Sequence, residues 1–203
     1  MAAFRVIFMK TTKTEILQAA LTVFSAKGYE GALMRDISDS LGITKPALYK
    51  HYESKEALWQ AMIAMVESYY REHMAAVSLS IPESWEAFRA QVWRQIDFTM
   101  HDTTVRKMRR LLTLEQFRNE KMALLASKHF LTDNEARFRT LLAGMMSSGL
   151  MKTGDAAFLA YEFTAPITLL IHLCDREPDK EGTALQRMQA HIRCFEEMYR
   201  REA

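Results

Sequence analysis

The sequence predicts an all-α protein. Hydrophobic residues make up 49% and charged residues 26% of its 203 residues, which are globular proportions and exclude a wholly disordered or collagen-like chain. Seven glycines and four prolines are fewer than a turn-rich β-sandwich or barrel needs. In nearly every segment the apolar residues recur with the 3.6-residue period of a helix.

The first two helices are marked by glycines that end them. Apolar residues from Ile16 to Phe24 form one stripe of a helix that begins near Thr12. Gly28 is expected to end this helix as a C-cap glycine. A short second helix is expected over residues 35–41, and Gly42 ends it.

Hydroxyl side chains mark the start of the next two helices. Thr44 is a good N-cap for a brief helix that ends near Tyr52, and proline is tolerated in its first turn at Pro46. Ser54 caps a fourth helix, which is expected to run to about Val77.

The rest of the chain also reads as helices. Ser80 and Glu83 form a capping box with an intervening proline, and Asp155 caps a later helix in which Pro166 is expected to produce a kink. The expected helices span about 83–100, 104–117, 120–147, 155–174 and 183–201.

The charge of +2 is too small to predict a nucleic-acid partner by itself, but its distribution is uneven. Residues 1–56 carry 8 Lys and Arg against 6 Asp and Glu, and residues 57–203 carry 19 against 19. The excess of positive charge therefore lies in the first quarter of the chain.

The two cysteines, Cys174 and Cys194, make no disulfide framework and suit a reducing cytoplasm, so a cytoplasmic location is expected. The N-terminus lacks the long apolar region of a signal peptide, and residues 1–11 are expected to form a flexible extension, with Met9 as an alternative start. The longest apolar stretch, residues 165–174, is about half a bilayer span, so no membrane segment is expected.

The tight turn at residues 42–44 joins the second and third helices into a helix-turn-helix pattern. Apolar residues at Ile37, Leu41, Ile43 and Leu48 would hold these two helices at a fixed angle. Short helices joined by a glycine turn also occur as plain packing units, so the pattern leaves that interpretation open.

The exposed face of the third helix suits a DNA major groove. A helix turns about 100° per residue, so Pro46 and Lys50 point away from buried Leu48, with Ala47 and Tyr49 beside them. Small residues allow close approach, and tyrosine and lysine can donate to phosphates or base edges.

Four strings of this region resemble the TetR family of bacterial transcriptional regulators. They are ILQAALTVFSAKGY at 16–29, RDIS at 35–38, LGITKPALYKHY at 41–52 and ESKEAL at 53–58. The resemblance covers residues 12–60 without a gap. Beyond it, only the size and the all-helical pattern agree with the family.

The resemblance implies a regulator without enzymatic activity or cofactor, which binds operator DNA as a homodimer and responds to a small molecule. Its helix-turn-helix DNA-binding domain would span residues 12–56, and its helical effector-binding and dimerisation domain residues 57–203. By position, the recognition segment comprises Thr44, Lys45, Pro46, Ala47, Tyr49, Lys50 and His51.

Two further phosphate contacts follow by position from the same resemblance. Tyr49 and Lys55 match residues of the family that contact phosphates. The family usually has Thr or Ser just before the second helix, where this chain has Ala32 and Leu33. One phosphate contact is therefore in doubt, and Arg35 is a candidate to replace it.

The family also implies an effector cavity among the helices at 83–100, 104–117 and 120–147, with the helix from Ser54 to about Val77 as the lever towards the DNA-binding domain. The candidate cavity residues are Trp93, Ile96, Asp97, Phe98, Met100, His101, Met108, Phe117, Met122, Phe130 and Phe163. Asp97 and His101 lie one helical turn apart, so one ligand could meet both, and a basic group on that ligand would suit Asp97. The alternative is that this pair is an exposed salt bridge and the aromatic residues are core.

The family places its dimer contact on the last two long helices. Their apolar residues are too numerous for one buried face per helix: Phe158, Tyr161, Phe163, Leu169, Leu170, Leu173, Leu185, Met188, Ile192, Phe195 and Met198.

Other interpretations remain open for three groups of residues. His172, Cys174, His191 and Cys194 on the last two helices are either packing residues or a metal or thiol sensor. The basic run from Arg106 to Arg110 is either a solvated face or a contact for an anion. His101–Asp102 is an adjacent pair without any accompanying signature of an enzyme.

Overall fold

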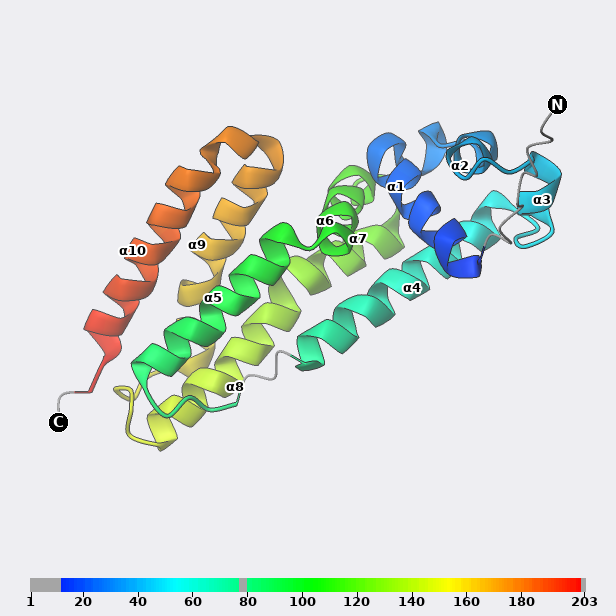
Figure 1. Ribbon diagram of the computed structural model, residues 1–203. Coiled ribbons are helices and arrows are strands. Elements are labelled where there is room, and N and C mark those ends of the chain that lie inside the picture. Colours follow the sequence, from blue (N-terminus) through cyan, green and yellow to red (C-terminus); the bar gives the residue numbers. More distant parts are fainter. Residues whose placement is uncertain (1–11, 77–79, 202–203) are drawn as a thin grey trace, which may run out of the picture. The chain divides into compact units, whose positions relative to one another are not determined.

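The computed structural model describes residues 12–76 and 80–201, and this part of the chain is built from helices (Figure 1). Its only β-type pairing is an isolated antiparallel bridge between Met151 and Arg200. The all-α prediction is therefore confirmed. The chain forms two compact units that divide inside one helix, between Tyr69 and Tyr70.

The first unit contains α1 (Lys13–Gly31), α2 (Met34–Ser40), α3 (Lys45–Tyr49) and the beginning of α4 (Lys55–Ala76). Thr12 and Glu15 cap α1 reciprocally. At Gly28 the backbone has φ +71°, a left-handed value that glycine adopts without strain, and the regular helix ends there as expected before one further turn.

Aromatic rings hold α1 against α4 within this unit. Phe24 is fully buried and meets Trp59 edge to face, with 4.9 Å between the ring centroids. Tyr29 packs against the same indole at 5.0 Å. Ile37 and Leu48 are also fully buried, so α2 and α3 are fixed on this core as the sequence predicts.

The second unit contains the end of α4 and six further α-helices. They are α5 (Trp85–His101), α6 (Thr103–Glu115), α7 (Glu120–Ser127), α8 (Asp133–Ser147), α9 (Ala156–Arg176) and α10 (Glu181–Tyr199). Its aromatic core is centred on Phe163 of α9, whose ring lies 5.3 Å from Phe88, 5.1 Å from Phe138 and 4.7 Å from Phe195. The core therefore joins α5, α8, α9 and α10.

Two expected helix boundaries are wrong. The helix expected from residue 83 begins at Trp85, because the Ser84 hydroxyl accepts from the Ala87 N–H, whereas Ser80 contacts the Gln91 amide. The single helix expected over 120–147 is interrupted by a π-helical turn, η1 (Lys128–Thr132), in which the Asp133 N–H reaches the Lys128 carbonyl. This turn holds one residue more than an α-helical turn.

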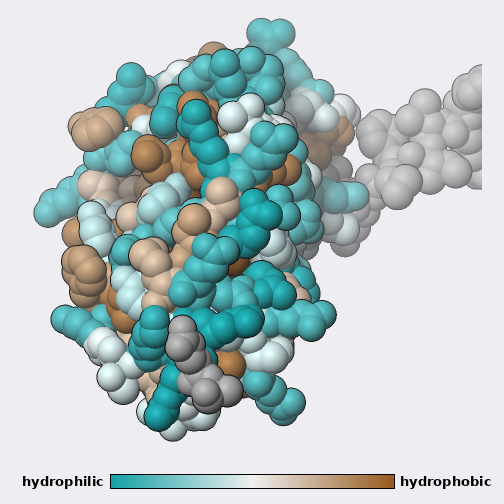
Figure 2. All heavy atoms as spheres, turned by 90° about the vertical axis from the view of Figure 1, so that its left-hand side faces the viewer, coloured by the Kyte–Doolittle hydropathy of each residue, from teal (hydrophilic) through white to brown (hydrophobic). Residues whose placement is uncertain are grey.

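α9 is the one described helix that is long and apolar enough to cross a membrane by length and composition. In this structure it packs in the core of the second unit, between α8 and α10. Its exposed side carries Phe158, Tyr161 and Leu169. Figure 2 looks at the side on which α10 lies, where hydrophobic side chains are scattered among hydrophilic ones.

Candidate functional site

The turn between α2 and α3 is closed by backbone hydrogen bonds that depend on a glycine. Gly42 has φ +63°, and apart from its own atoms and its two chain neighbours no heavy atom lies within 4 Å of the position that a Cβ would occupy. The Ile43 N–H donates to the Ser38 carbonyl at 3.0 Å, and the Gly42 N–H to the Asp39 carbonyl at 3.1 Å. The positive φ lets the chain leave α2 and start α3 without an irregular loop.

The solvent-facing side of α3 presents the residues expected for DNA contact. Thr44 caps the helix by accepting from the Ala47 N–H at 3.3 Å, and Leu48 is fully buried beneath it. Lys45, Pro46, Tyr49 and Lys50 are exposed, while Ala47 and His51 are half-buried. The Lys45 ammonium lies 5.7 Å from the centre of the Tyr49 ring, so a cation and a phenol share one edge of this surface.

Lys55 is held at the start of α4 by contacts with α1. Its ammonium lies 4.4 Å from the centre of the Tyr29 ring and 3.5 Å from the Glu30 carbonyl oxygen. The Tyr29 hydroxyl donates to Glu56 at 2.8 Å, and burial together with this carboxylate raises the pKa of Tyr29 to about 12. The tyrosine therefore stays neutral near pH 7, and its ring and the Glu30 carbonyl hold the Lys55 ammonium in a defined position.

The start of α2 differs from the usual family pattern, as the sequence indicates. Leu33 occupies the N-cap with its side chain 59% exposed, and no side-chain hydroxyl caps the helix. The Asp36 carboxylate accepts from the Leu33 N–H at 2.9 Å and pairs with Lys27 at 2.8 Å. Arg35 is exposed and lies 3.4 Å from Asp39, so its guanidinium is available to a phosphate only in competition with that carboxylate.

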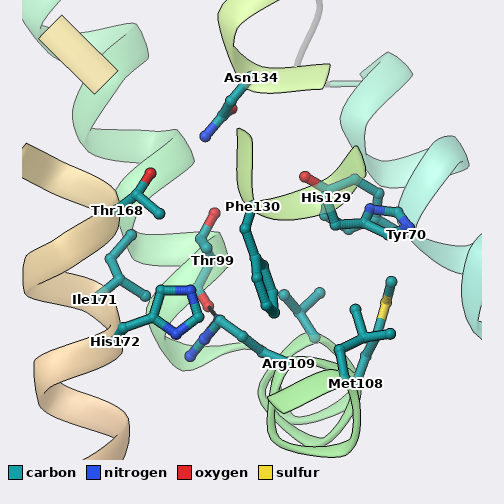
Figure 3. Close-up of a pocket in the computed structure, with 12 residues that line it drawn as sticks. Tyr70, Thr99, Met108, Arg109, His129, Phe130, Asn134, Thr168, Ile171 and His172 are labelled. Atoms are coloured by element: carbon teal, nitrogen blue, oxygen red, sulfur yellow. Dashed lines mark hydrogen bonds between the residues drawn. The ribbon is translucent and has the colours of Figure 1, made fainter. Parts of the chain in front are cut away.

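The second unit contains a cavity of about 40 Å³ (Figure 3). It is bounded by α4, α5, α6, the π turn with the start of α8, and α9. The residues that line it are Tyr70, Thr99, Val105, Met108, Arg109, Leu112, His129, Phe130, Asn134, Thr168, Ile171 and His172. Figure 3 shows Tyr70 and His129 on one side, His172 and Ile171 on the other, and Phe130 between them.

Arg109, held in an ion pair, is the charged residue of the cavity wall. Arg109 of α6 donates from Nε and Nη2 to the two carboxylate oxygens of Asp175, at 2.5 and 2.7 Å. Its Nη1 donates to the Thr99 carbonyl, also at 2.5 Å. The Arg109 side chain is 6% exposed, so a buried guanidinium is matched by one carboxylate and one carbonyl.

The π turn brings two aromatic side chains to the cavity. His129 meets the Tyr70 ring edge to face at 4.6 Å, and Phe130 meets the His172 ring in the same manner at 4.5 Å. Burial lowers the pKa of His129 to about 4 and also lowers the pKa of His172. Both imidazoles are therefore neutral near pH 7.

The cavity includes only part of the set of ligand residues expected from the sequence. Met108 and Phe130 line it, and Ile96 lines a neighbouring cavity of about 20 Å³. Met100, Met122 and Phe163 are buried in the core. Phe98 stacks on His73, Trp93 lines a separate charged surface groove, and Phe117 is 91% exposed.

Asp97 and His101 lie on the surface, apart from the cavity. The His101 ring nitrogens meet Asp97 at 2.8 Å and Glu181 at 3.2 Å, and these two carboxylates raise the pKa of His101. The pair joins α5 to the start of α10, which agrees with the salt-bridge alternative.

The residues considered for a metal or thiol site are not brought together. His172 faces the cavity, and His191 contacts the Phe163 carbonyl at 2.9 Å. Cys174 is buried and Cys194 is exposed. Among the residues that the structure describes, no three His, Cys, Asp or Glu side chains are grouped as metal ligands.

Several cavity residues escaped the sequence reasoning. Tyr70, His129 and Asn134 lie on segments interpreted as parts of long regular helices, and a helical period gives no sign of an inserted residue. Arg109 belongs to the basic run 106–110, whose basic side chains look alike in sequence although Arg109 is the one of them that is buried. The apolar residues around it, Met108, Leu111 and Leu112, were the signal in the sequence that could have indicated its burial.

Comparison with known proteins places the first unit in a family. Residues 16–62 match the bacterial regulatory proteins of the tetR family. Over 58 residues the chain is 40% identical to IcaR of Staphylococcus epidermidis, the negative regulator of a biofilm operon, and this match spans 29% of the chain and 31% of IcaR. Over 144 residues it is 26% identical to the repressor KstR2 of Rhodococcus jostii, which covers 68% of the chain and 65% of KstR2.

The fold of nearly the whole chain is similar to that of solved regulators. SmeT, the repressor of the Stenotrophomonas maltophilia multidrug efflux pump SmeDEF, superposes with a TM-score of 0.67 over 96% of this chain and 93% of SmeT, at 18% identity. This likeness concerns the fold, whereas the matched helix-turn-helix sequence carries the family assignment. The helix-turn-helix region of this chain, residues 16–62, therefore matches the TetR family of bacterial regulatory proteins, and the chain spans less than two thirds of the length of IcaR and of KstR2.

Proposed function

We propose that this chain is a transcriptional regulator, without enzymatic activity, that binds operator DNA through α3 and represses the adjacent genes. The observation that carries the proposal is the exposed surface of Lys45, Tyr49 and Lys50 on a helix fixed by buried Leu48. Cationic and hydroxyl donors on a short helix of this kind suit the major groove and its phosphates. IcaR, KstR2 and SmeT are all negative regulators or repressors, and this similarity favours repression as the mode of action.

The proposed regulator acts as a cytoplasmic homodimer on a palindromic operator. One recognition helix contacts too few base pairs for useful specificity, and a two-fold dimer doubles the site. Phe158, Tyr161 and Leu169 form an exposed apolar stripe along α9, and Met198 of α10 is also exposed. These side chains are the proposed contact between the two copies, because apolar stripes of this kind are typical of interfaces.

The proposed effector is a small, mostly apolar molecule that binds in the cavity beside Phe130. A structure of SmeT holds triclosan, which supports a small-molecule ligand in this fold. Helix α4 contributes Trp59 to the core of the first unit and Tyr70 to the cavity. A ligand that favours one position of Tyr70 would shift the population of DNA-binding conformers by its difference in affinity for them.

DNA binding is tested by gel shift with fragments from the upstream region of the protein's own gene and its neighbours. Tyr49→Ala or Lys50→Ala is expected to weaken binding by roughly 1–3 kcal/mol. Lys55→Ala is expected to weaken all sequences alike and to lower the salt slope by about one. Arg187→Ala, on the exposed side of α10, is the matched charge control. Wild-type binding by the triple variant of Tyr49, Lys50 and Lys55 would refute this assignment of α3.

A further inference from the structure

The wall of the cavity carries no net charge. The only charged side chain among its lining residues is Arg109, and Asp175 neutralises it through two hydrogen bonds. His129 and His172 remain neutral near pH 7 because burial lowers the pKa of each ring. A charged ligand would lose its hydration here without an unpaired opposite charge among the lining side chains to replace it, which is costly.

Besides the buried Nη2 of Arg137, a cation whose charge acts on Tyr70 and Asp133, three polar atoms in and beside the cavity have no hydrogen-bond partner among the described residues. Both ring nitrogens of His129, Nδ1 and Nε2, are buried without a hydrogen bond among the described residues. The same holds for Oε1 of Gln95, whose Nε2 donates to Asn134 at 2.7 Å. A buried polar atom without a partner is destabilising, so a ligand that satisfies these atoms gains affinity.

These unsatisfied atoms belong to two adjacent cavities that share part of their walls. His129 lines the first cavity and Gln95 the neighbouring one, and the two cavities share Thr99, Asn134 and Ile171 as walls. A neutral imidazole has one donor and one acceptor nitrogen, whereas an amide oxygen only accepts. A ligand that reaches both ends therefore needs a hydroxyl group near His129 and a donor near Gln95.

The space between these ends favours a flat molecule. The volumes of about 40 and 20 Å³ are far below the roughly 300–1,000 Å³ of a typical occupied site, so side chains must part on binding. Phe130 stands between the His129 and His172 sides of the cavity (Figure 3). A thin aromatic ring requires the smallest displacement of Phe130 and can stack on the rings that it meets.

We propose that the cavity binds an uncharged, flat aromatic molecule with hydroxyl groups at opposite ends, one contacting His129 and the other Gln95. This proposal rests on the proposed effector function of the same cavity. It replaces the basic group that the sequence offered for Asp97, because that carboxylate lies on the surface with His101.

The ligand class is tested with the purified full-length protein, by calorimetry and thermal shift. The probes are biphenyl-4,4′-diol, biphenyl, biphenyl-4-carboxylate and 4-(aminomethyl)biphenyl, which share one aromatic frame and differ in charge and hydroxyl groups. The diol is expected to bind about tenfold more tightly than biphenyl and at least tenfold more tightly than either charged probe, as about 1.4 kcal/mol changes affinity tenfold.

Two variants locate the hydroxyl contacts. His129→Phe and Gln95→Leu each remove one unsatisfied polar group, so each is expected to lower the diol-to-biphenyl preference about threefold or more without weakening biphenyl. His101→Phe, an exposed histidine outside the cavity, is the matched control and should keep the wild-type preference. Circular dichroism establishes that each variant is folded, and two independent variants keep the test decisive if one of them is not.

Three outcomes would overturn the proposal: a charged probe that binds as tightly as the diol, an unchanged preference in the folded variants, or binding of none of the four probes. Gel shifts run in parallel separate this inference from the proposed function. If biphenyl-4-carboxylate binds and releases DNA, the regulator function stands and the ligand class is wrong. If DNA binding fails, the calorimetric ranking still decides the ligand class.

Discussion

Removing the carboxylate that neutralises Arg109 is expected to destabilise the second unit strongly. In Asp175→Asn, the 6%-exposed guanidinium loses the opposite charge of its two hydrogen bonds at 2.5 and 2.7 Å. Breaking a buried ion pair at one partner costs about 3–5 kcal/mol. Asp175 is itself 22% exposed and Thr99 still accepts from Arg109, so we expect the lower end, about 3 kcal/mol.

The cost is measured by urea unfolding at fixed protein concentration, followed by circular dichroism. For a chain of this length, about 3 kcal/mol corresponds to a fall in melting temperature of roughly 6–12 °C. The double variant Arg109→Met/Asp175→Leu removes both charges and should lie within about 1 kcal/mol of wild type. Asp179→Asn, at an exposed site, is the control. If the single and double variants lose equal stability, the uncompensated charge is not the cause.

Three further predictions concern the turn and two histidines. Gly42→Ala forces φ +63° on a residue with a Cβ, so the free energy of unfolding should fall by about 1–2 kcal/mol. Gly182→Ala is the control, because Gly182 has no positive φ and its substitution should not destabilise the protein. Equal melting curves for the two variants would contradict this prediction. The pKa of His129 falls from 6.5 to about 4 on folding, so the unfolded chain binds more protons than the folded one between these pH values. The free energy of unfolding should therefore drop by up to roughly 3 kcal/mol from pH 7 to pH 4. His129→Phe should flatten this part of the plot of stability against pH. The pKa of His101 is raised by Asp97 and Glu181, so its contribution is present below pH 6.5 and is lost as pH rises through the folded pKa. His101→Gln should therefore lose more stability at pH 5.5 than at pH 8.5, by less than about 1 kcal/mol since the site is exposed, and an equal loss at both would count against the ion pairs.

The proposed DNA-binding surface could be predicted from the sequence because short-range rules determine it. Thr44 caps α3, Gly42 supplies the left-handed turn, and Leu48 sets which face is buried. Each of these effects acts within a few residues, so periodicity and capping rules place Tyr49 and Lys50 on the exposed face.

The cavity could not be predicted in the same way because it depends on contacts between distant segments. Arg109 is buried by its pairing with Asp175, 66 residues away, and the helical period that places Arg109 on one face with Val105 and Leu112 does not reveal which carboxylate pairs with it. Phe163 looked like a cavity residue in sequence, yet it is fully buried among three other phenylalanines. Aromatic residues on adjacent turns do not reveal whether they surround space or fill it.

The π turn at Lys128–Thr132 separates two helical registers that must serve different neighbours. Upstream, α7 buries Met122 and Ala126, and downstream α8 buries Phe138 and Leu142. The extra residue changes the helical register by about 100°, so the buried faces of α7 and α8 do not have to lie on one continuous stripe. Deleting a single codon within the turn would impose one continuous register and rotate His129 and Phe130 relative to α8. The inserted residue therefore lets α7 and α8 each keep a buried face of its own, and its loss would force one of the two helices to give up its packing.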